Sequence, residues 1–262
     1  MRNRILLVFL LLILVLGTVV QAAELTGRDI MVKVDNRDDG DTRKAKMVMT
    51  LINNVGDKRI REVVSYQKDY GKDTKAIMIF ESPGDVKGTG YLSWEYDDED
   101  KEDNRWLYMP ALRKIRRISG SSNDDYFMGT DFTYDDMGDR NVDEDEHTLL
   151  REEELNGYQC WVIQSIPKEI DEGDYTKKIS WIRQDIAMAI KTDYYNEYGL
   201  LKTYQAKDIV EIDGIWTPKQ RLMVNKQDEH QTIIDMTELK FNVAMDDNLF
   251  RTSMLKRGNI RY

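Results

Sequence analysis

The sequence predicts a mainly β protein with a few short helices, in which one strongly curved antiparallel sheet forms an incomplete barrel. Apolar residues alternate with polar ones over most of the chain, as they do in strands that bury one face. Turn pairs such as Asn156-Gly157 and Asp213-Gly214 separate these segments and are typical of β-hairpins. The pattern gives roughly ten strands, which are too many for a flat sheet. We therefore expect the sheet to curl and its concave side to be covered by helices or loops.

The first 22 residues have the composition of a secretory signal peptide. Arg2 and Arg4 precede an unbroken apolar run over residues 5–16, and small residues lead to Ala22. A retained membrane anchor is the alternative interpretation, but the run is shorter than the roughly 20 residues that a membrane-spanning helix needs. We expect a signal peptide over residues 1–22 that is cleaved after Ala22, export to the periplasm, and a single domain over residues 23–262.

Charge and cysteine content narrow the range of partners. The chain has a formal net charge of −10 at pH 7, which disfavours binding to nucleic acid and to anionic lipid surfaces. Cys160 is the one cysteine, so the chain has no internal disulfide and no cysteine for lipid attachment near the cleavage site. Because Cys160 stands beside Trp161 in an expected strand, we predict a buried, unreactive thiol. Lipid contact should be apolar and local, or should use the basic run of Arg113, Lys114, Arg116 and Arg117.

The N-terminal part of the mature chain should form a short helix and then a meander. Apolar residues recur on one helical face over residues 25–37, and Thr26 with Asp29 forms a capping pattern at the start. Three alternating segments follow as strands, with turn residues between them. These strands cover residues 43–52, 58–67 and 74–81.

The stretch from Asn104 to Asp136 gathers cations and large apolar side chains in an otherwise acidic chain. Its first residues alternate as a strand, which Pro110 ends because proline cannot donate to a ladder. The basic run follows, either as a solvated loop or as a contact for a partner or lipid headgroup. An aromatic segment over residues 124–137 comes next and also carries acids and glycines. Two interpretations remain open for this segment: a movable lid, or an edge strand or ordered loop with aromatic anchors.

The second half of the chain should contain six more strands, because the alternating pattern returns there. Acidic turns at residues 97–103 and 143–146 lack the spacing of a calcium loop, so we expect them to be solvated. The six strands cover residues 158–167, 177–184, 187–195, 200–212, 216–225 and 230–241.

The sequence carries no catalytic, metal-binding or cofactor-binding pattern. His147 and His230 are the two histidines, and neither stands near a serine or cysteine motif such as Gly-x-Ser-x-Gly. Spacings such as His-x-x-x-His and Cys-x-x-Cys are also absent. We therefore expect a protein that is not an enzyme and needs no metal or cofactor, although a composite site could still assemble in the fold.

The order of these motifs resembles the outer-membrane lipoprotein-sorting family, a LolA/LolB-like group. The resemblance covers nearly the whole mature chain and rests on Trp106-Leu107-Tyr108-Met109-Pro110, the basic run, and Phe127-Met128-Gly129-Thr130-Asp131-Phe132. It implies an incomplete barrel whose hydrophobic cavity, closed by helices, holds acyl chains in transit through the periplasm. The lipoprotein carrier has an Arg-Pro pair where this chain has Ser82-Pro83, and that arginine latches the lid. The latch is therefore absent here or is supplied elsewhere.

The resemblance implies a periplasmic carrier of lipoprotein or lipid acyl chains to an outer-membrane acceptor. An inner-membrane transporter of the resistance-nodulation-division (RND) type is a further expected partner. The alternative is a non-catalytic envelope adaptor that binds an exporter or another protein without lipid cargo. From the faces of the strands and from the aromatic segment, we expect the acyl cavity to be lined by Met47, Met49, Leu51, Ile77, Ile79, Trp106, Tyr108, Phe127, Met128 and Phe132.

Overall fold

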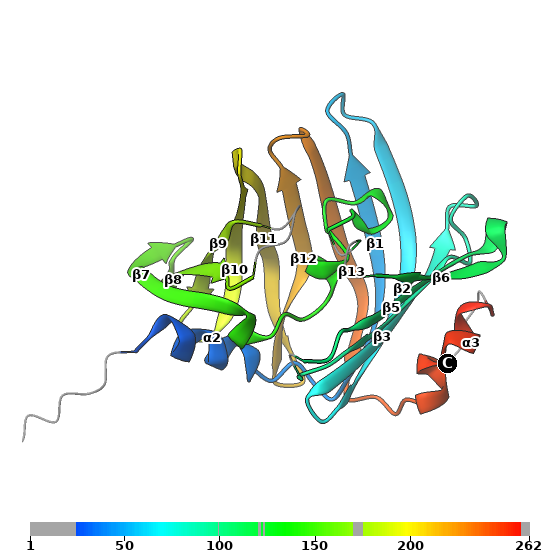
Figure 1. Ribbon diagram of the computed structural model, residues 1–262, viewed down its shortest axis with the longest axis horizontal. Helices are drawn as coiled ribbons and strands as arrows, with labels where there is room; N and C mark the ends of the chain where they lie inside the picture. Colours follow the sequence, from blue (N-terminus) through cyan, green and yellow to red (C-terminus); the bar gives the residue numbers. More distant parts are fainter. Residues whose placement is uncertain (1–24, 99, 120–121, 123, 170–174, 258–262) are drawn as a thin grey trace, which may run out of the picture.

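The computed structural model contains one antiparallel sheet that curves into an open half-barrel (Figure 1). It describes residues 25–98, 100–119, 122, 124–169 and 175–257, so the expected signal peptide lies outside the described residues. Thirteen strands form the sheet in this part of the chain, and the two outermost strands do not pair with each other. The fold class predicted from the sequence is confirmed. Among the helices described, none has the length and apolar character needed to cross a membrane.

Two meanders supply the strands. The first consists of β1 (Thr42–Ile52), β2 (Lys58–Tyr70), β3 (Asp73–Ser82), β4 (Gly90–Glu95), β5 (Asn104–Met109) and β6 (Lys114–Ile118). The second consists of β7 (Asp145–Leu155), β8 (Tyr158–Pro167), β9 (Lys177–Arg183), β10 (Met188–Asn196), β11 (Gly199–Ile212), β12 (Ile215–Asn225) and β13 (His230–Phe241). Short 3-10 helices in the connections are η1 (Pro110–Leu112), η3 (Phe127–Gly129), η4 (Asp135–Met137) and η5 (Val142–Glu144).

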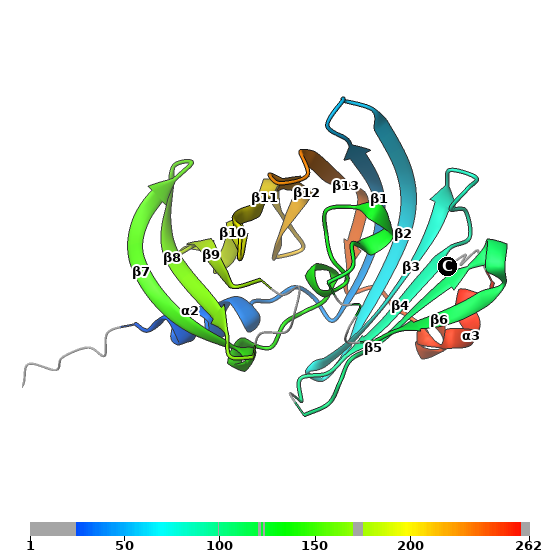
Figure 2. The same cartoon turned by 45° about the horizontal axis from the view of Figure 1, so that its top comes forward.

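Pairing between β1 and β13 joins the two meanders into one sheet. The strand order is β6-β5-β4-β3-β2-β1-β13-β12-β11-β10-β9-β8-β7, so β6 and β7 are the free edges. The chain must therefore travel from one edge of the sheet to the other between β6 and β7. It does so inside the curve of the sheet (Figure 2). We call residues 124–137 of this connection the crossing segment.

Helix α2 (Gly27–Asp35) lies along the concave side at the β7 end of the sheet (Figure 2). Its capping box is the predicted one: the Asp29 N–H donates to Thr26 Oγ1 over 3.1 Å, and the Thr26 N–H donates to Asp29 Oδ2 over 3.0 Å. Ile30 is fully buried and packs against Ile163 of β8 and Ile182 of β9. Burial of one such side chain contributes about 1.5–3 kcal/mol, which fixes the helix on the sheet.

A C-terminal segment covers the convex face of the first meander, and the sequence analysis did not predict it. The segment consists of η6 (Asp247–Phe250) and α3 (Thr252–Leu255) (Figure 1). Leu249, Phe250 and Leu255 are buried against apolar residues that point outward from β2 to β5. Trp94 Nε1 also donates to Phe250 O over 2.9 Å. Both faces of the first meander are therefore buried.

Three strands were missing from the sequence prediction. β4 is only six residues long, so its alternation is hard to recognise. β6 contains three of the four residues of the basic run, and β7 begins inside the stretch that was expected to be an acidic turn at 143–146. Both of these are edge strands, on which charged side chains prevent pairing with other chains and weaken the apolar pattern. Lys114, Arg116 and Arg117 of the basic run therefore lie on an edge strand and not in a solvated loop, while Arg113 caps η1.

Replacing Gly27 with alanine should loosen α2 from the sheet. A Cβ atom at Gly27 would stand 2.7 Å from the backbone carbon and oxygen of His147, so one of the two backbones must shift. Overpacking of this kind costs about 1–3 kcal/mol, which chemical denaturation of Gly27→Ala should detect. The matched control is Gly84→Ala, where the added methyl group meets nothing within 4 Å. Equal stability of the two variants would contradict the close docking of α2.

Candidate functional site

Apolar side chains from both meanders and from the crossing segment meet on the concave side of the sheet. Met49, Phe80 and Phe127 are fully buried there. The ring of Phe127 lies against Tyr91 and Tyr134, with centroids 5.2 and 5.5 Å away. We call this group the concave cluster. Its buried members are Ala45, Met47, Met49, Leu51, Val63, Met78, Phe80, Tyr91, Leu107, Ile118, Phe127, Phe132, Tyr134, Met223, Ile234 and Met236.

The structure brings together six of the ten residues that were expected to line an acyl cavity. β1 contributes three of them to the concave cluster, and the crossing segment contributes the other three, of which Met128 is partly buried. Their binding of acyl chains stays a prediction. These six are Met47, Met49, Leu51, Phe127, Met128 and Phe132.

The other four expected residues lie on the opposite face of the sheet. Ile77 and Ile79 of β3 are buried under the C-terminal segment, and Trp106 and Tyr108 of β5 pack in the same outer cluster. The face assigned to these four residues was wrong. Both faces of β3 and β5 are apolar, because the C-terminal segment covers one of them, so alternation could not show which face points inward. The residues that point inward from these strands are Met78, Phe80 and Leu107.

A tight loop over residues 126–133 gives the crossing segment its shape. The Phe127 N–H donates to Phe132 O over 2.7 Å, and Tyr126 forms an isolated β-bridge with Thr133. These bonds turn the rings of Phe127 and Phe132 toward the sheet, where both are buried. The expectation that this segment buries its apolar side against a concave surface is therefore confirmed, whereas its movement as a lid stays a prediction.

Buried polar contacts attach the crossing segment to β11, β13 and β2. Thr232 Oγ1 donates to the Asp131 carboxylate over 2.6 Å, and His230 Nδ1 lies 2.7 Å from the same oxygen. Asp131 is 3% exposed, so these contacts lie out of water. Arg61 of β2 donates to the carbonyl oxygen of Met128. The side chains of β2 and β13 thus hold the crossing segment against the sheet.

Lys202 of β11 is a fully buried attachment, like Thr232. Its Nζ donates to Asp131 O over 2.9 Å and to Asp136 Oδ2 over 2.5 Å, and the residue is 0% exposed. Tyr175 Oη also donates to the Asp136 carboxylate, over 3.0 Å. Burial lowers the pKa of Lys202, while the Asp136 charge acts in the opposite direction. Sequence reasoning missed Lys202, because a lone lysine in a strand normally points into solvent.

The surroundings of His147 and Cys160 are those of residues with a structural role. His147 Nδ1 lies 2.8 Å from Ser165 Oγ, and its Nε2 lies 2.8 Å from Val142 O, so both ring nitrogens are occupied. Ser165 is itself buried. Cys160 is buried as predicted, and burial raises the pKa of its thiol. No cluster of His, Cys, Asp and Glu able to hold a metal occurs in the part of the chain that the structure describes.

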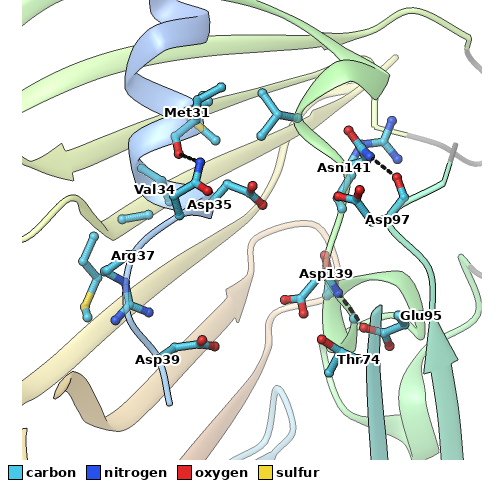
Figure 3. Close-up of a pocket in the computed structure, with 18 of the residues that line it drawn as sticks. Met31, Val34, Asp35, Arg37, Asp39, Thr74, Glu95, Asp97, Asp139 and Asn141 are labelled. Atoms are coloured by element: carbon cyan, nitrogen blue, oxygen red, sulfur yellow. Dashed lines mark hydrogen bonds between the residues drawn. The ribbon is translucent and has the colours of Figure 1, made fainter. Parts of the chain in front are cut away.

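A cleft of about 910 Å³ opens between α2 and the end of the crossing segment (Figure 3). Arg37 and Asp39 stand on the wall that follows α2, and Glu95 and Asp139 stand on the facing wall. The volume falls within the range of roughly 300–1,000 Å³ that is typical of small-molecule sites. Phe132 lines the cleft and also belongs to the concave cluster, so the two are continuous. The apolar part of the lining includes Met31, Val34, Phe132, Met188, Tyr194 and Tyr204.

Glu95 of β4 is a buried carboxyl at the inner wall of this cleft. Its Oε2 accepts from the Asp139 N–H over 3.0 Å. A Cβ atom at Gly138 would stand 2.8 Å from Glu95 Oε1, so a larger residue at this position would displace the Glu95 carboxyl. Burial, and after it the charge of Asp139, raises the pKa of Glu95 to about 8. Sequence reasoning missed the cleft, because its charged residues stand singly in distant segments.

The basic run lies exposed on the edge strand β6 and the residue before it, and none of its residues lines the cleft. Arg117 Nη2 lies 3.5 Å from Glu102 Oε2, and both side chains are more than half exposed, so this pair contributes little. A role for Arg113, Lys114, Arg116 and Arg117 in contacting a partner or headgroup stays a prediction.

Comparison with known proteins finds close structural relatives. A family model described as an uncharacterized protein matches residues 72–257. A DUF1329 family protein from Desulfovibrio piger is 33% identical, with 87% of this chain and 97% of that chain covered and a TM-score of 0.83. A domain from Vibrio parahaemolyticus, named provisionally as an outer membrane lipoprotein-sorting protein, is 29% identical, with 88% and 98% covered and a TM-score of 0.82.

More distant likeness extends to the LolA superfamily. A member from Nitrosomonas europaea is 18% identical, with 88% of this chain and 100% of that chain covered, and its TM-score of 0.69 shows a shared fold. None of the curated proteins compared with the chain matches it. The resemblance stated from the sequence motifs is confirmed by these structures.

Replacing Lys202 with methionine should release the crossing segment. The change leaves the Asp136 carboxylate buried without its cation, which costs about 3–5 kcal/mol. Amide hydrogen exchange over residues 124–137 should become faster than in the wild type. Lys207→Met is the matched control, because Lys207 is exposed on the same strand. Unchanged exchange in Lys202→Met would show that the aromatic contacts alone hold the segment.

Stability should fall as the pH rises from 6 to 8, because the folded state then loses the Glu95 proton. The raised pKa of about 8, against 4.5 for an ordinary glutamate, means that the folded state binds more protons than the unfolded state in this window. The expected slope is at most about 1.4 kcal/mol per pH unit. Urea denaturation of Glu95→Gln should show a flatter pH profile, and the exposed Glu81→Gln serves as control. A rise in wild-type stability over this window would refute the assignment.

Proposed function

Because this chain belongs to the DUF1329 family and shares the half-barrel of LolA superfamily proteins, we propose that it is a carrier of acyl chains. The carrier binds lipids or the acyl chains of lipoproteins between its concave face and the crossing segment, without catalysis. One observation carries the proposal: a large apolar cluster on the concave face is continuous with an open cleft through Phe132. Such a surface fits a ligand with a long apolar part.

The energetics of this activity follow from the hydrophobic effect. Each CH₂ group that moves from water to an apolar cavity gains roughly 0.8 kcal/mol, so one or two chains supply ample affinity. Release then requires an acceptor that is equally apolar. Methionine side chains adapt to ligands of variable shape, and five of the buried residues of the concave cluster are methionines. They are Met47, Met49, Met78, Met223 and Met236.

Loading of the carrier would use a shift of the crossing segment. Phe127 and Phe132 fill the concave cluster in this structure, so a long chain must take their place or extend from the cleft beside them. Exchange of aromatic rings for an acyl chain replaces one apolar contact by another, which keeps the net free energy small. Lys202 and Arg61 then set how readily the segment moves, because they hold its backbone.

The setting that we propose for this activity is the periplasm. The expected signal peptide over residues 1–22 would deliver one domain, residues 23–262, to that compartment without lipidation. The proposed route takes cargo from an RND-type inner-membrane transporter to an outer-membrane acceptor. The exposed cations of β6 form the surface that we assign to a partner or to lipid headgroups.

A non-catalytic envelope adaptor is the second candidate. The observation that favours it is that the crossing segment already fills the concave cluster, as expected of a protein with an ordinary core. The adaptor would bind an exporter or another protein through its exposed basic edge strand and would take up no lipid. Binding of an amphiphile by the purified protein separates the two functions.

Placing a charge in the apolar lining of the cleft should weaken acyl binding. Met31 of α2 is partly buried and lines the cleft, so Met31→Glu can keep its fold while putting a carboxylate beside the chain. We expect at least a tenfold weaker uptake of a fluorescent fatty acid by the delipidated variant, because about 1.4 kcal/mol already gives that factor.

The matched control for this experiment is Ile60→Glu, since Ile60 is 54% exposed on the convex face. Undiminished uptake in a folded Met31→Glu variant would move the acyl site out of the cleft. Failure of the wild-type protein to take up any fatty acid would refute the carrier and support the adaptor.

A further inference from the structure

Three arginines from distant parts of the chain converge beside the cleft. Arg37 follows α2, Arg43 lies near the start of β1, and Arg221 lies on β12. Arg37 and Arg221 line the cleft. Burial lowers the pKa of Arg37 and of Arg43, and the nearby charge of Arg221 lowers both further. The guanidinium groups repel one another, and the charge of Asp39 offsets part of that repulsion.

Arg221 has a buried donor without a partner. Its Nε is out of water and forms no hydrogen bond within the described part of the chain. A buried donor left unpaired costs about 1–3 kcal/mol, and more when the group is charged. Its guanidinium also forms no ion pair within 4.0 Å with any residue that the structure describes. Such an atom at the wall of a cleft lacks a partner that a ligand or a bound water can supply.

Arg37 and Arg43 are held in place by neutral groups. Arg37 Nη1 donates to Trp216 O over 2.8 Å and to Asp38 O over 3.2 Å. Arg43 Nη2 donates to the side-chain oxygen of Gln67. Neutral acceptors fix the direction of a guanidinium without cancelling its charge, so both side chains keep their full charge for a further anion.

The other cations of the cleft differ, because each has a carboxylate partner. Arg28 lies 2.6 Å from Asp143, Lys72 lies 3.0 Å from Asp97, and Arg140 lies 2.8 Å from Asp145. These pairs also account for two of the acids in the cleft lining. Arg37, Arg43 and Arg221 therefore differ from these cations, because none of the three forms an ion pair with a carboxylate in the described part of the chain.

The other acids of the cleft lining differ in how strongly they can compete for these arginines. Asp136 is paired with Lys202, and the raised pKa keeps Glu95 largely protonated at neutral pH. Asp39 and Asp139 act on the arginines from beyond ion-pair distance. Asp35 and Asp69 also line the cleft, and burial raises the pKa of Asp69 to about 6 and raises that of Asp139 too, so the lining favours the neutral form of these two carboxyls while the arginines keep their charge.

We propose that Arg37, Arg43 and Arg221 form a subsite for a phosphate monoester, the headgroup of a lipid whose acyl chain lies on the apolar lining of the cleft. Guanidinium groups bind phosphate through paired N–H donors, which Arg221 has available. Tyr204 links the two parts, because it lines the cleft and its hydroxyl lies within the field of both Arg221 and Arg37. This inference rests on the carrier function proposed above and adds the class of headgroup.

Calorimetric titration with three ligands tests the subsite and separates lipid from free phosphate. The ligands are lysophosphatidic acid, a monoacylglycerol with the same acyl chain, and glycerol 3-phosphate. The proteins are the wild type, Arg221→Met and the control Arg59→Met, whose arginine is exposed on β2. We expect Arg221→Met to bind lysophosphatidic acid at least about tenfold more weakly, with monoacylglycerol unaffected, because a hydrogen bond to a charged group is lost.

Two further measurements keep the test decisive. Added salt should weaken binding of lysophosphatidic acid and leave monoacylglycerol binding unchanged. Arg37→Met provides a second variant if Arg221→Met does not fold. Equal binding of both lipids by the wild type and Arg221→Met would overturn the phosphate subsite and retain the carrier. Arginine-dependent binding of glycerol 3-phosphate without binding of either lipid would retain the anion site and overturn the carrier.

Discussion

The pairing of β1 with β13 is the constraint on which the rest of the structure depends. It places the first and last strands of the chain side by side in the middle of the sheet, so that the free edges, β6 and β7, come from the middle of the sequence. The connection between these edges must then travel across the curved sheet, and it does so on the concave side (Figure 2). The cover of the concave face is thus a consequence of the chain's route and not an added domain.

Polar and apolar contacts have different roles in holding that cover. The rings of Phe127 and Phe132 bury area that an acyl chain could bury equally well, so they add stability without selecting one occupant. The buried contacts of Lys202 and Asp131 need particular geometry, and a buried ion pair contributes orientation more than net stability because desolvation offsets its attraction. A closure built in this way has a defined position and a small free-energy bias, which suits reversible loading.

Much of the fold could be predicted from local patterns, whereas the site depended on contacts between distant segments. The Thr26–Asp29 capping box and most of the strands follow from neighbouring residues, and both were predicted correctly. The inward face of β3 could not be predicted, because the C-terminal segment makes its outward face apolar too. Lys202 and Arg221 look like ordinary strand residues in the sequence. Their roles arise only where the curved sheet brings them against the crossing segment and the cleft.

The net charge of the chain and the arginines of the cleft act on anionic lipids in opposite directions. The chain carries a net charge of −10, so a bilayer rich in anionic lipids repels it as a whole, within the Debye length of roughly 8 Å at physiological salt. Arg221 and its neighbours act at shorter range, inside a cleft where screening is weaker. The net charge therefore opposes adsorption to such a membrane, whereas the proposed subsite would favour a single anionic lipid inside the cleft. With this combination the protein can bind one lipid molecule without adsorbing to the membrane that supplies it. A carrier requires this property, because it must leave the membrane after loading.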